Sequence, residues 1–143
     1  MKKLTTINIV AGVVIKQDGK YLLVKENRPG TNVHGLWNFP AGKVEKGDSI
    51  EKTAIKEAKE EVGYDVELIR RLGIFQASVA APPKHAFEAK VVGGSLQWPK
   101  DEILEAKWFT WQKIQRMKNR LREEWIIEAI RIIEEGSRDC INP

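Results

Sequence analysis

The sequence has a single cysteine, Cys140, and only two histidines, His34 and His85, among its 143 residues. One cysteine cannot form an intrachain disulfide, and no group of cysteines and histidines has the spacing of zinc ligands, so disulfide scaffolds and zinc modules are excluded. No segment approaches the ~18 to 20 apolar residues that a membrane-spanning helix needs. We therefore expect a cytoplasmic protein in a reducing compartment, with no membrane partner.

The excess of positive charge is confined to one short segment. The chain carries 24 Lys and Arg against 20 Asp and Glu, a formal charge of +4. Residues 112–122 hold five of these bases and no acid, which leaves 19 bases against 20 acids in the rest of the chain. We interpret the five bases as a helix face in contact with water, so a nucleic-acid partner is disfavoured but stays open as an alternative.

Two common nucleotide-binding motifs are also absent. Residues 42–47 have the glycine spacing of a P-loop, but Asp48 stands where that motif needs a lysine, and an acid there would repel phosphates. No G-x-G-x-x-G run occurs either. The sequence thus supports neither a P-loop nor a Rossmann site.

The order of the predicted elements indicates a single α/β domain. The chain length suits one domain, residues 1–143, and no linker or repeat divides it. Asp18-Gly19 between two apolar segments predicts a hairpin. The predicted strands are 7–17, 20–26, 65–79, 87–92 and 105–109, and the predicted helices are 49–62 and 111–135. Because strands and helices alternate irregularly, we expect helices packed on a mixed sheet.

On the predicted helix 49–62, acidic side chains share a face with apolar ones. At ~100° per residue, Glu57 and Glu61 fall on the side of the small and apolar residues, Glu60 borders that sector, and the lysines take the opposite side. Like charges at this spacing destabilise a helix, and partial burial adds to the cost unless a cation compensates. Carboxylates without His or Cys favour Mg²⁺ or Mn²⁺. A solvated Glu/Lys helix is the alternative. Asp48 or Ser49 is expected to be the N-cap of this helix, and for Asp48 that role is favoured over the role of a metal ligand.

A resemblance to a known family lies in residues 42–64, GKVEKGDSIEKTAIKEAKEEVGY. This segment resembles the Nudix hydrolase signature, G-x(5)-E-x(7)-R-E-U-x-E-E-x-G-U, in which U is a bulky apolar residue. The positions in register are Gly42, Glu57, Glu60, Glu61 and Gly63. The preceding Trp37-Asn38-Phe39-Pro40-Ala41 also resembles the family's lead-in. The resemblance implies an α/β/α sandwich with a mixed sheet between helices.

Two positions depart from the signature in ways that bear on the site. Asp48 stands where the signature has Glu, and it remains acidic. Lys56 stands where the signature has Arg, and lysine lacks the planar, bidentate grip of a guanidinium. Neither departure removes a metal-binding carboxylate, so the implied site is retained.

The resemblance also implies a reaction and the residues that perform it. Nudix enzymes use Mg²⁺ or Mn²⁺ to hydrolyse a nucleoside diphosphate linked to another group. By analogy, the metal ligands would be Glu57, Glu60, Glu61, the backbone carbonyl of Ala41 and, further downstream, Glu102. Glu57 is our first choice for the general base. The implied substrate contacts are Arg28 or Lys25, with Trp37 and Phe39 as stacking candidates for which core packing is the favoured interpretation.

Missing subfamily markers point to the MutT-like group. The proline that ADP-ribose enzymes tend to carry after the signature is replaced by Val79 and Ala80, and no tyrosine follows Tyr64, as diadenosine-polyphosphate enzymes tend to have. MutT-like members convert nucleoside or deoxynucleoside triphosphates to monophosphate and pyrophosphate. Hydrolysis of ADP-ribose or a dinucleoside polyphosphate, and a non-catalytic nucleotide- or RNA-binding role, stay open, as does the oligomeric state.

Overall fold

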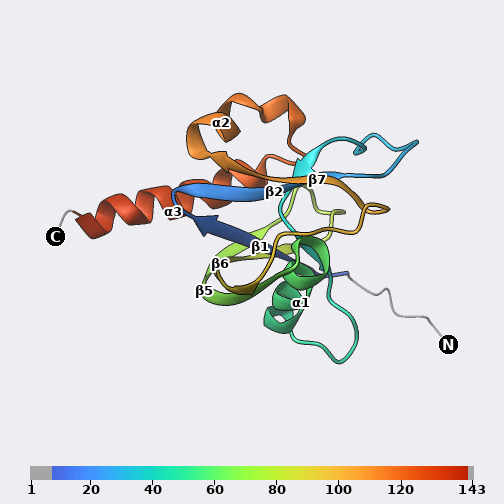
Figure 1. The fold of residues 1–143 in the computed structure, drawn as a ribbon, viewed down its shortest axis with the longest axis horizontal. Helices are drawn as coiled ribbons and strands as arrows, with labels where there is room; N and C mark the ends of the chain where they lie inside the picture. Colours follow the sequence, from blue (N-terminus) through green and yellow to red (C-terminus); the bar gives the residue numbers. More distant parts are fainter. Residues whose placement is uncertain (1–7, 142–143) are drawn as a thin grey trace.

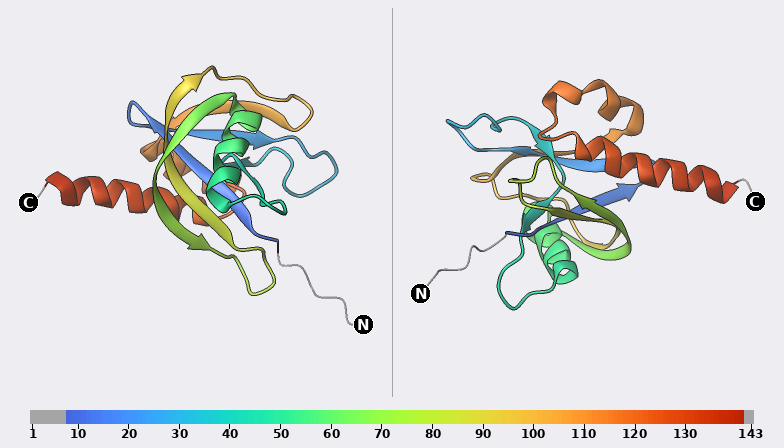
Figure 2. Two further views of the ribbon diagram at one scale, coloured as in Figure 1. Left: turned by 90° about the horizontal axis from the view of Figure 1, so that it is seen from below. Right: turned by 180° about the vertical axis from the view of Figure 1, so that it is seen from behind.

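A central sheet lies between two helical layers in the computed structural model, which describes residues 8–141 and the side chains as far as residue 136. Ile7, the predicted start of the first strand, and the Cys140 side chain lie outside this part. Helix α1 (Ile50–Val62) covers one face of the sheet, and α3 (Trp125–Ile141) covers the other (Figures 1 and 2). The predicted α/β/α sandwich is therefore confirmed. No helix in the described residues is long and apolar enough to cross a membrane.

The predicted hairpin joins β1 (Val10–Gln17) to β2 (Lys20–Glu26). Its turn residues, Asp18 and Gly19, have φ angles of 52° and 76°. A type I′ turn needs positive φ at both central positions, which is why Asp-Gly suits it. The hairpin places the end of β2 beside the segment that carries the site.

Seven strands form the sheet within the described residues. They are β1 and β2, with β3 (Trp37–Asn38), β4 (Ala41–Lys43), β5 (Tyr64–Phe75), β6 (Lys84–Gly94) and β7 (Ile103–Thr110). The order is β3-β2-β1-β6-β5, while β4 pairs with β1 and β7 with β2. β1 and β6 run parallel and the other pairs run antiparallel, so the sheet is mixed as predicted.

One strand ends earlier than the sequence indicates. β5 stops at Phe75, before the predicted end at residue 79. The Gln76 side chain donates to the carbonyl of Ala81 at 2.6 Å and closes a loop ahead of the two prolines. β6 then begins earlier than predicted, at Lys84, because it pairs with β5 as far as Phe75.

Local signals define both ends of α1. The Ser49 hydroxyl accepts a hydrogen bond from the Lys52 N–H at 3.0 Å. Ser49 is therefore the N-cap, one of the two residues predicted for it, and Asp48 instead pairs with the Lys52 ammonium at 3.3 Å. The helix ends at Gly63, whose φ of 78° favours glycine.

The prediction of a single helix over residues 111–135 was wrong. The segment forms α2 (Trp111–Arg116), a 3₁₀ turn (Lys118–Arg120) and then α3. The chain breaks at Leu121, which is extended, bridges to Trp37 of β3 and packs in the core. Buried residues continue at helical spacing through the break, at Ile114, Met117 and Leu121, and this explains why periodicity alone missed it.

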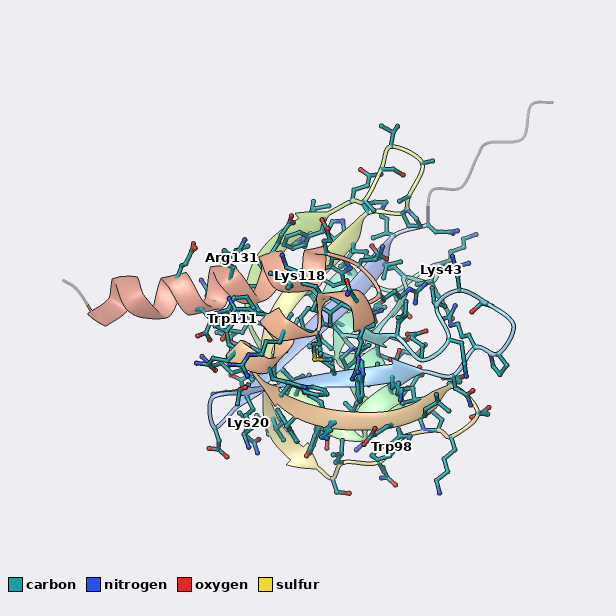
Figure 3. The ribbon with its side chains drawn as sticks, turned by 90° about the horizontal axis from the view of Figure 1, so that it is seen from above. Lys20, Lys43, Trp98, Trp111, Lys118 and Arg131 are labelled. Atoms are coloured by element: carbon teal, nitrogen blue, oxygen red, sulfur yellow. The ribbon has the colours of Figure 1, made fainter. Side chains whose placement is uncertain are left out.

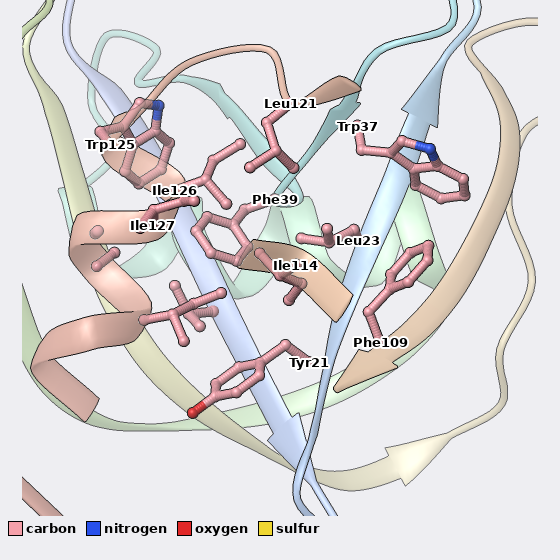
Figure 4. Packing of buried hydrophobic residues seen from close by; sticks show 14 of the residues in the cluster. Tyr21, Leu23, Trp37, Phe39, Phe109, Ile114, Leu121, Trp125, Ile126 and Ile127 are labelled. Carbon is pink, nitrogen blue, oxygen red and sulfur yellow. The ribbon is translucent and has the colours of Figure 1, made fainter. Parts of the chain in front are cut away.

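Alternate residues of the central strands enter two separate apolar cores. Val14 and Leu23 pack toward α2 and α3, whereas Val13 and Leu22 pack toward α1. All four side chains are fully buried. Figure 4 shows the first core, where Leu23 lies among aromatic side chains and residues of α3. Because both faces of β1 and β2 are packed, these strands form a rigid base for the loops that follow them.

Candidate active site

A cavity of about 510 Å³ lies where α1, β4 and the end of β2 meet. Helix α1 contributes Glu57 and Glu61, and β4 contributes Gly42. The end of β2 contributes Glu26, and the loop after it contributes Arg28. Segments far apart in the sequence therefore place acidic and basic groups around one space.

The face of α1 that carries Glu57 and Glu61 is also the face that packs on the sheet. Thr53, Ala54 and Ala58 on this face are buried. Glu57 and Glu61 are partly buried at its edge, where their carboxyl groups line the cavity. The predicted arrangement of acids among small residues is thus present.

Gly42 and Glu57 are in close approach. A Cβ placed on Gly42 would overlap the carboxyl group of Glu57. Only the absence of a side chain at position 42 lets the Glu57 carboxylate lie against the backbone of β4. The first glycine of the signature therefore has a structural role: it makes the space for this carboxylate.

Burial governs the protonation of the two carboxyl groups. Burial raises the pKa of Glu61 well above its ordinary value, and the hydrogen bond with Glu57 and the charges of Glu57 and Glu26 raise it further. A backbone hydrogen bond from Ala41 acts in the opposite direction. Burial also raises the pKa of Glu57, while its hydrogen bond with Glu61 lowers it. In the absence of a cation the pair therefore tends to hold a proton.

The donor set fits a hard divalent cation. The cavity lining carries six carboxyl groups (Glu26, Glu45, Glu57, Glu61, Asp101 and Glu102) against four bases (Arg28, Lys43, Lys84 and Arg122). Among residues 8–136, neither Glu57 nor Glu61 has an ion-pair partner within 4.0 Å. The same part of the chain contains no group of three Asp, Glu, His or Cys side chains that could hold a metal ion. Mg²⁺ usually binds through one or two carboxylates plus substrate phosphates, so two partly buried glutamates suffice for it.

The remaining predicted metal ligands occupy different places. Glu102 lies at the exposed rim of the same cavity, and Ala41 lines it beside Glu61. Glu60 is exposed and borders another cavity, of about 300 Å³, together with Trp98. The charge of Glu60 still raises the pKa of Glu57, so the two carboxyl groups are neighbours.

The family model for the NUDIX domain matches residues 6–130. The chain belongs to the Nudix family. A solved Nudix hydrolase from Nitrosomonas europaea shares the fold: it superimposes with a TM-score of 0.79 and 29% identity, covering 92% of this chain and 90% of that one.

Two curated Nudix relatives are named for different substrates. A "Putative 8-oxo-dGTP diphosphatase" from Bacillus subtilis is 30% identical over 67% of this chain and 61% of its own length. An "ADP-ribose pyrophosphatase" from Methanocaldococcus jannaschii is 30% identical over 73% of this chain and 62% of its own length. The chain spans between 35% and 62% of the length of the curated relatives it matches first.

The structure places three of the predicted substrate contacts in different surroundings: Arg28 lies at the cavity, and Trp37 and Phe39 lie in the core. Arg28 lines the cavity, with its Nε 2.9 Å from the Glu26 carboxylate. Phe39 is fully buried against Trp125, with ring centroids 5.4 Å apart, and Trp37 is buried edge-on against Phe109. Both rings are buried, as the favoured interpretation of core packing expects, and neither lines the cavity.

Glu26 and Arg122 are among the charged residues of the Nudix cavity that sequence reasoning missed. Glu26 ends β2 and is 9% exposed, and its carboxylate faces the cavity instead of solvent. Arg122 ends the basic segment whose side chains were expected to face water. Four of those bases are exposed, among them Lys118 on the helical layer (Figure 3), but Arg122 is partly buried at the cavity. The alternation of side chains along β2 could have indicated that Glu26 points the same way as the buried Val24, whereas nothing in the sequence distinguishes Arg122 from the other bases of its segment.

Proposed function

We propose that this chain is a Mg²⁺- or Mn²⁺-dependent pyrophosphohydrolase that converts a nucleoside or deoxynucleoside triphosphate to the monophosphate and pyrophosphate. The observation that carries the proposal is the pair of partly buried glutamates, Glu57 and Glu61, facing a cavity that Arg28 also lines. Family membership and the name of the Bacillus relative support it.

The acidic residues would hold the metal and move the proton. Glu57 and Glu61 would hold the cation together with the Ala41 carbonyl and Glu102, which line the same cavity, and Glu60 would act from its place beside Glu57. When bound, the cation would polarise the diphosphate oxygens and lower the pKa of a water molecule. Glu57 accepts the proton of the attacking water as its oxygen bonds to phosphorus. The phosphorus–oxygen bond to the bridging oxygen breaks, and that oxygen leaves with the departing phosphate group.

The bases of the cavity position the substrate. Arg28 would donate to phosphate oxygens through the guanidinium N–H groups that Glu26 does not use. Because the lining is acidic overall, a polyanionic substrate is accepted only with its cation. This requirement joins metal binding and substrate binding in one step.

ADP-ribose hydrolysis is the second candidate function. The Methanocaldococcus relative is named for this activity, and it matches this chain at the same 30% identity as the Bacillus relative. Both substrates contain the diphosphate linkage that the same glutamates and cation would cleave. The two candidates differ only in the group beyond that linkage.

A substrate panel with Mg²⁺, scored by product, tests both candidates. Pyrophosphate with a monophosphate supports the triphosphate reaction, whereas AMP with ribose phosphate from ADP-ribose supports the second. Glu61→Gln should abolish either reaction while the protein stays folded, and Glu51→Gln, an exposed acid on the same helix, serves as the matched control. Full turnover in Glu61→Gln, or no product from any substrate, would contradict the proposal.

A further inference from the structure

Arg122 is the base of segment 112–122 that reaches the cavity. The other four, Lys113, Arg116, Lys118 and Arg120, are exposed and do not line it. The Arg122 side chain is 26% exposed, against 55% for Arg28. Arginine side chains are mostly exposed in proteins, so a partly buried guanidinium at a cavity indicates a role beyond solubility.

The backbone of Arg122 is held in place by the strand next to the site. Its N–H donates to the carbonyl of Trp37 at 2.8 Å, and the preceding residue, Leu121, bridges to Trp37 and is buried. The backbone of Arg122 is therefore anchored to the core. Only its side chain has to be ordered when a ligand binds, which limits the entropic cost.

A single carboxylate, that of Glu26, holds two guanidinium groups. Its Oε2 lies 2.9 Å from Nε of Arg28 and 3.3 Å from Nη1 of Arg122. One negative charge between two positive charges leaves this cluster with a net charge of +1. Each guanidinium has five N–H donors, so most of them remain for a ligand.

The other buried base of the cavity is already neutralised. The Lys84 ammonium lies 2.7 Å from the carboxylate of Glu123, and both side chains are largely buried. Lys43 is exposed at the rim. Apart from Lys43 at the rim, the bases of the cavity that outnumber their carboxylate partners are therefore Arg28 and Arg122, which share Glu26.

We infer that Arg122, together with Arg28, binds the phosphate group beyond the scissile linkage and makes the cavity selective for a free terminal phosphate. This inference rests on the proposed function. Planar guanidinium forks match phosphate oxygens, and a terminal phosphate carries more charge and more free oxygens than one esterified to a sugar. A nucleoside triphosphate satisfies both arginines, whereas ADP-ribose has no terminal phosphate to offer.

Binding of inorganic tripolyphosphate with Mg²⁺, measured by calorimetry, tests the inference without requiring turnover. Arg122→Gln should raise the Kd by about tenfold or more, as expected for a lost charged hydrogen bond. The Kd of Arg122→Lys should lie between those of the unmodified protein and Arg122→Gln, because an ammonium keeps the charge but lacks the planar fork of a guanidinium. Arg120→Gln, an exposed base of the same segment, is the matched control and should stay within about twofold of the unmodified protein.

Kinetics supply the second measurement. Arg122→Gln should lower kcat/KM for the triphosphate by about tenfold more than for ADP-ribose. The inference would be overturned if Arg122→Gln lowered kcat/KM equally for both substrates or left the tripolyphosphate Kd unchanged. It would also be overturned if Arg120→Gln raised that Kd as much as Arg122→Gln. If the unmodified protein hydrolyses nothing, the proposed function fails, and the tripolyphosphate Kd still decides the role of Arg122. If Arg122→Gln does not fold, Arg122→Lys decides it by the same comparison.

Discussion

The carboxyl group of Glu57 occupies the space where a side chain at position 42 would begin. The two residues belong to different elements, β4 and α1, and their contact brings the acidic face of the helix against the strand. A glycine at position 42 is therefore tied to the chemistry of the site more than to the shape of the backbone. The atoms that a new Cβ would meet lie at the end of a flexible side chain, so the fold can accommodate a substitution by moving Glu57.

Gly42→Ala should reduce activity much more than stability. The added methyl group displaces the Glu57 carboxylate, and we expect kcat/KM to fall by about 10²-fold, the contribution of a positioned general base. Gly47→Ala is the matched control: its φ of 91° is strained for alanine, but its Cβ would meet open space. That variant should lose about 1 kcal/mol of unfolding free energy and keep its activity. Urea unfolding and steady-state kinetics on both proteins measure the contrast, and full activity in Gly42→Ala would refute the role given to this glycine.

Glu61→Gln should stabilise the metal-free protein. The pKa of Glu61 is raised in the folded state, so folding favours the protonated form and the carboxylate opposes folding at neutral pH. A neutral amide removes that penalty, and the melting temperature in EDTA should rise by a few degrees. The increase in melting temperature that Mg²⁺ gives the unmodified protein should disappear in this variant, because one of the two glutamate ligands of the cation is lost.

Glu51→Gln serves as the comparison for these melting curves. Glu51 is exposed in the first turn of α1 and does not line the cavity, so its variant should keep the Mg²⁺-dependent increase. A Glu61→Gln protein that melts lower than the unmodified protein in EDTA would show that the Glu61 carboxylate supports the metal-free fold.

Short-range signals predicted the parts of the molecule that depend on neighbouring residues. The Asp18-Gly19 turn and the Ser49 and Gly63 ends of α1 follow from local backbone and capping preferences. The shared face of Glu57 and Glu61 follows from helix geometry in the same way.

Long-range contacts explain what the sequence could not predict. The break before α3 arises because Leu121 pairs with Trp37, a distant residue that no periodicity reveals. The same pairing brings Arg122 to Glu26, so one tertiary contact accounts for both the wrong helix and the missed arginine. The burial of Phe39 likewise depends on Trp125 from the last helix.

Lys56→Arg should raise activity. The Lys56 ammonium lies 4.0 Å from the Glu45 carboxylate, and its charge lowers the pKa of Glu57. A guanidinium keeps that charge and adds a planar fork able to hold a neighbouring carboxylate in one orientation. We expect kcat/KM to increase by about two- to fivefold, since a better-ordered acid is a modest gain. Lys52→Arg, an exposed lysine of the same helix, should leave kcat/KM unchanged, and a decrease in Lys56→Arg would contradict the prediction.

His85 should make stability depend on pH. Burial lowers its pKa below the ordinary 6.5, the nearby Arg71 guanidinium lowers it further, and the charge of Glu51 opposes them. Nη1 of Arg71 lies 2.6 Å from Nδ1 of His85, a contact that suits a neutral imidazole. Above pH 6.5 the imidazole is neutral in both the folded and the unfolded chain, so it costs nothing. As the pH falls below that value, only the unfolded chain gains the proton, and the unfolding free energy decreases until the folded imidazole is protonated too.

His85→Gln should remove this dependence. Urea unfolding between about pH 7.5 and pH 5 should show a flatter decline in unfolding free energy for the variant than for the unmodified protein. The ring protons of His85, followed by NMR, should titrate with a midpoint below 6.5. Arg71→Gln should move that midpoint upward, because the neighbouring positive charge is removed while burial by the sheet remains. A midpoint at or above 6.5 in the unmodified protein would show that the contact with Arg71 does not favour the neutral ring.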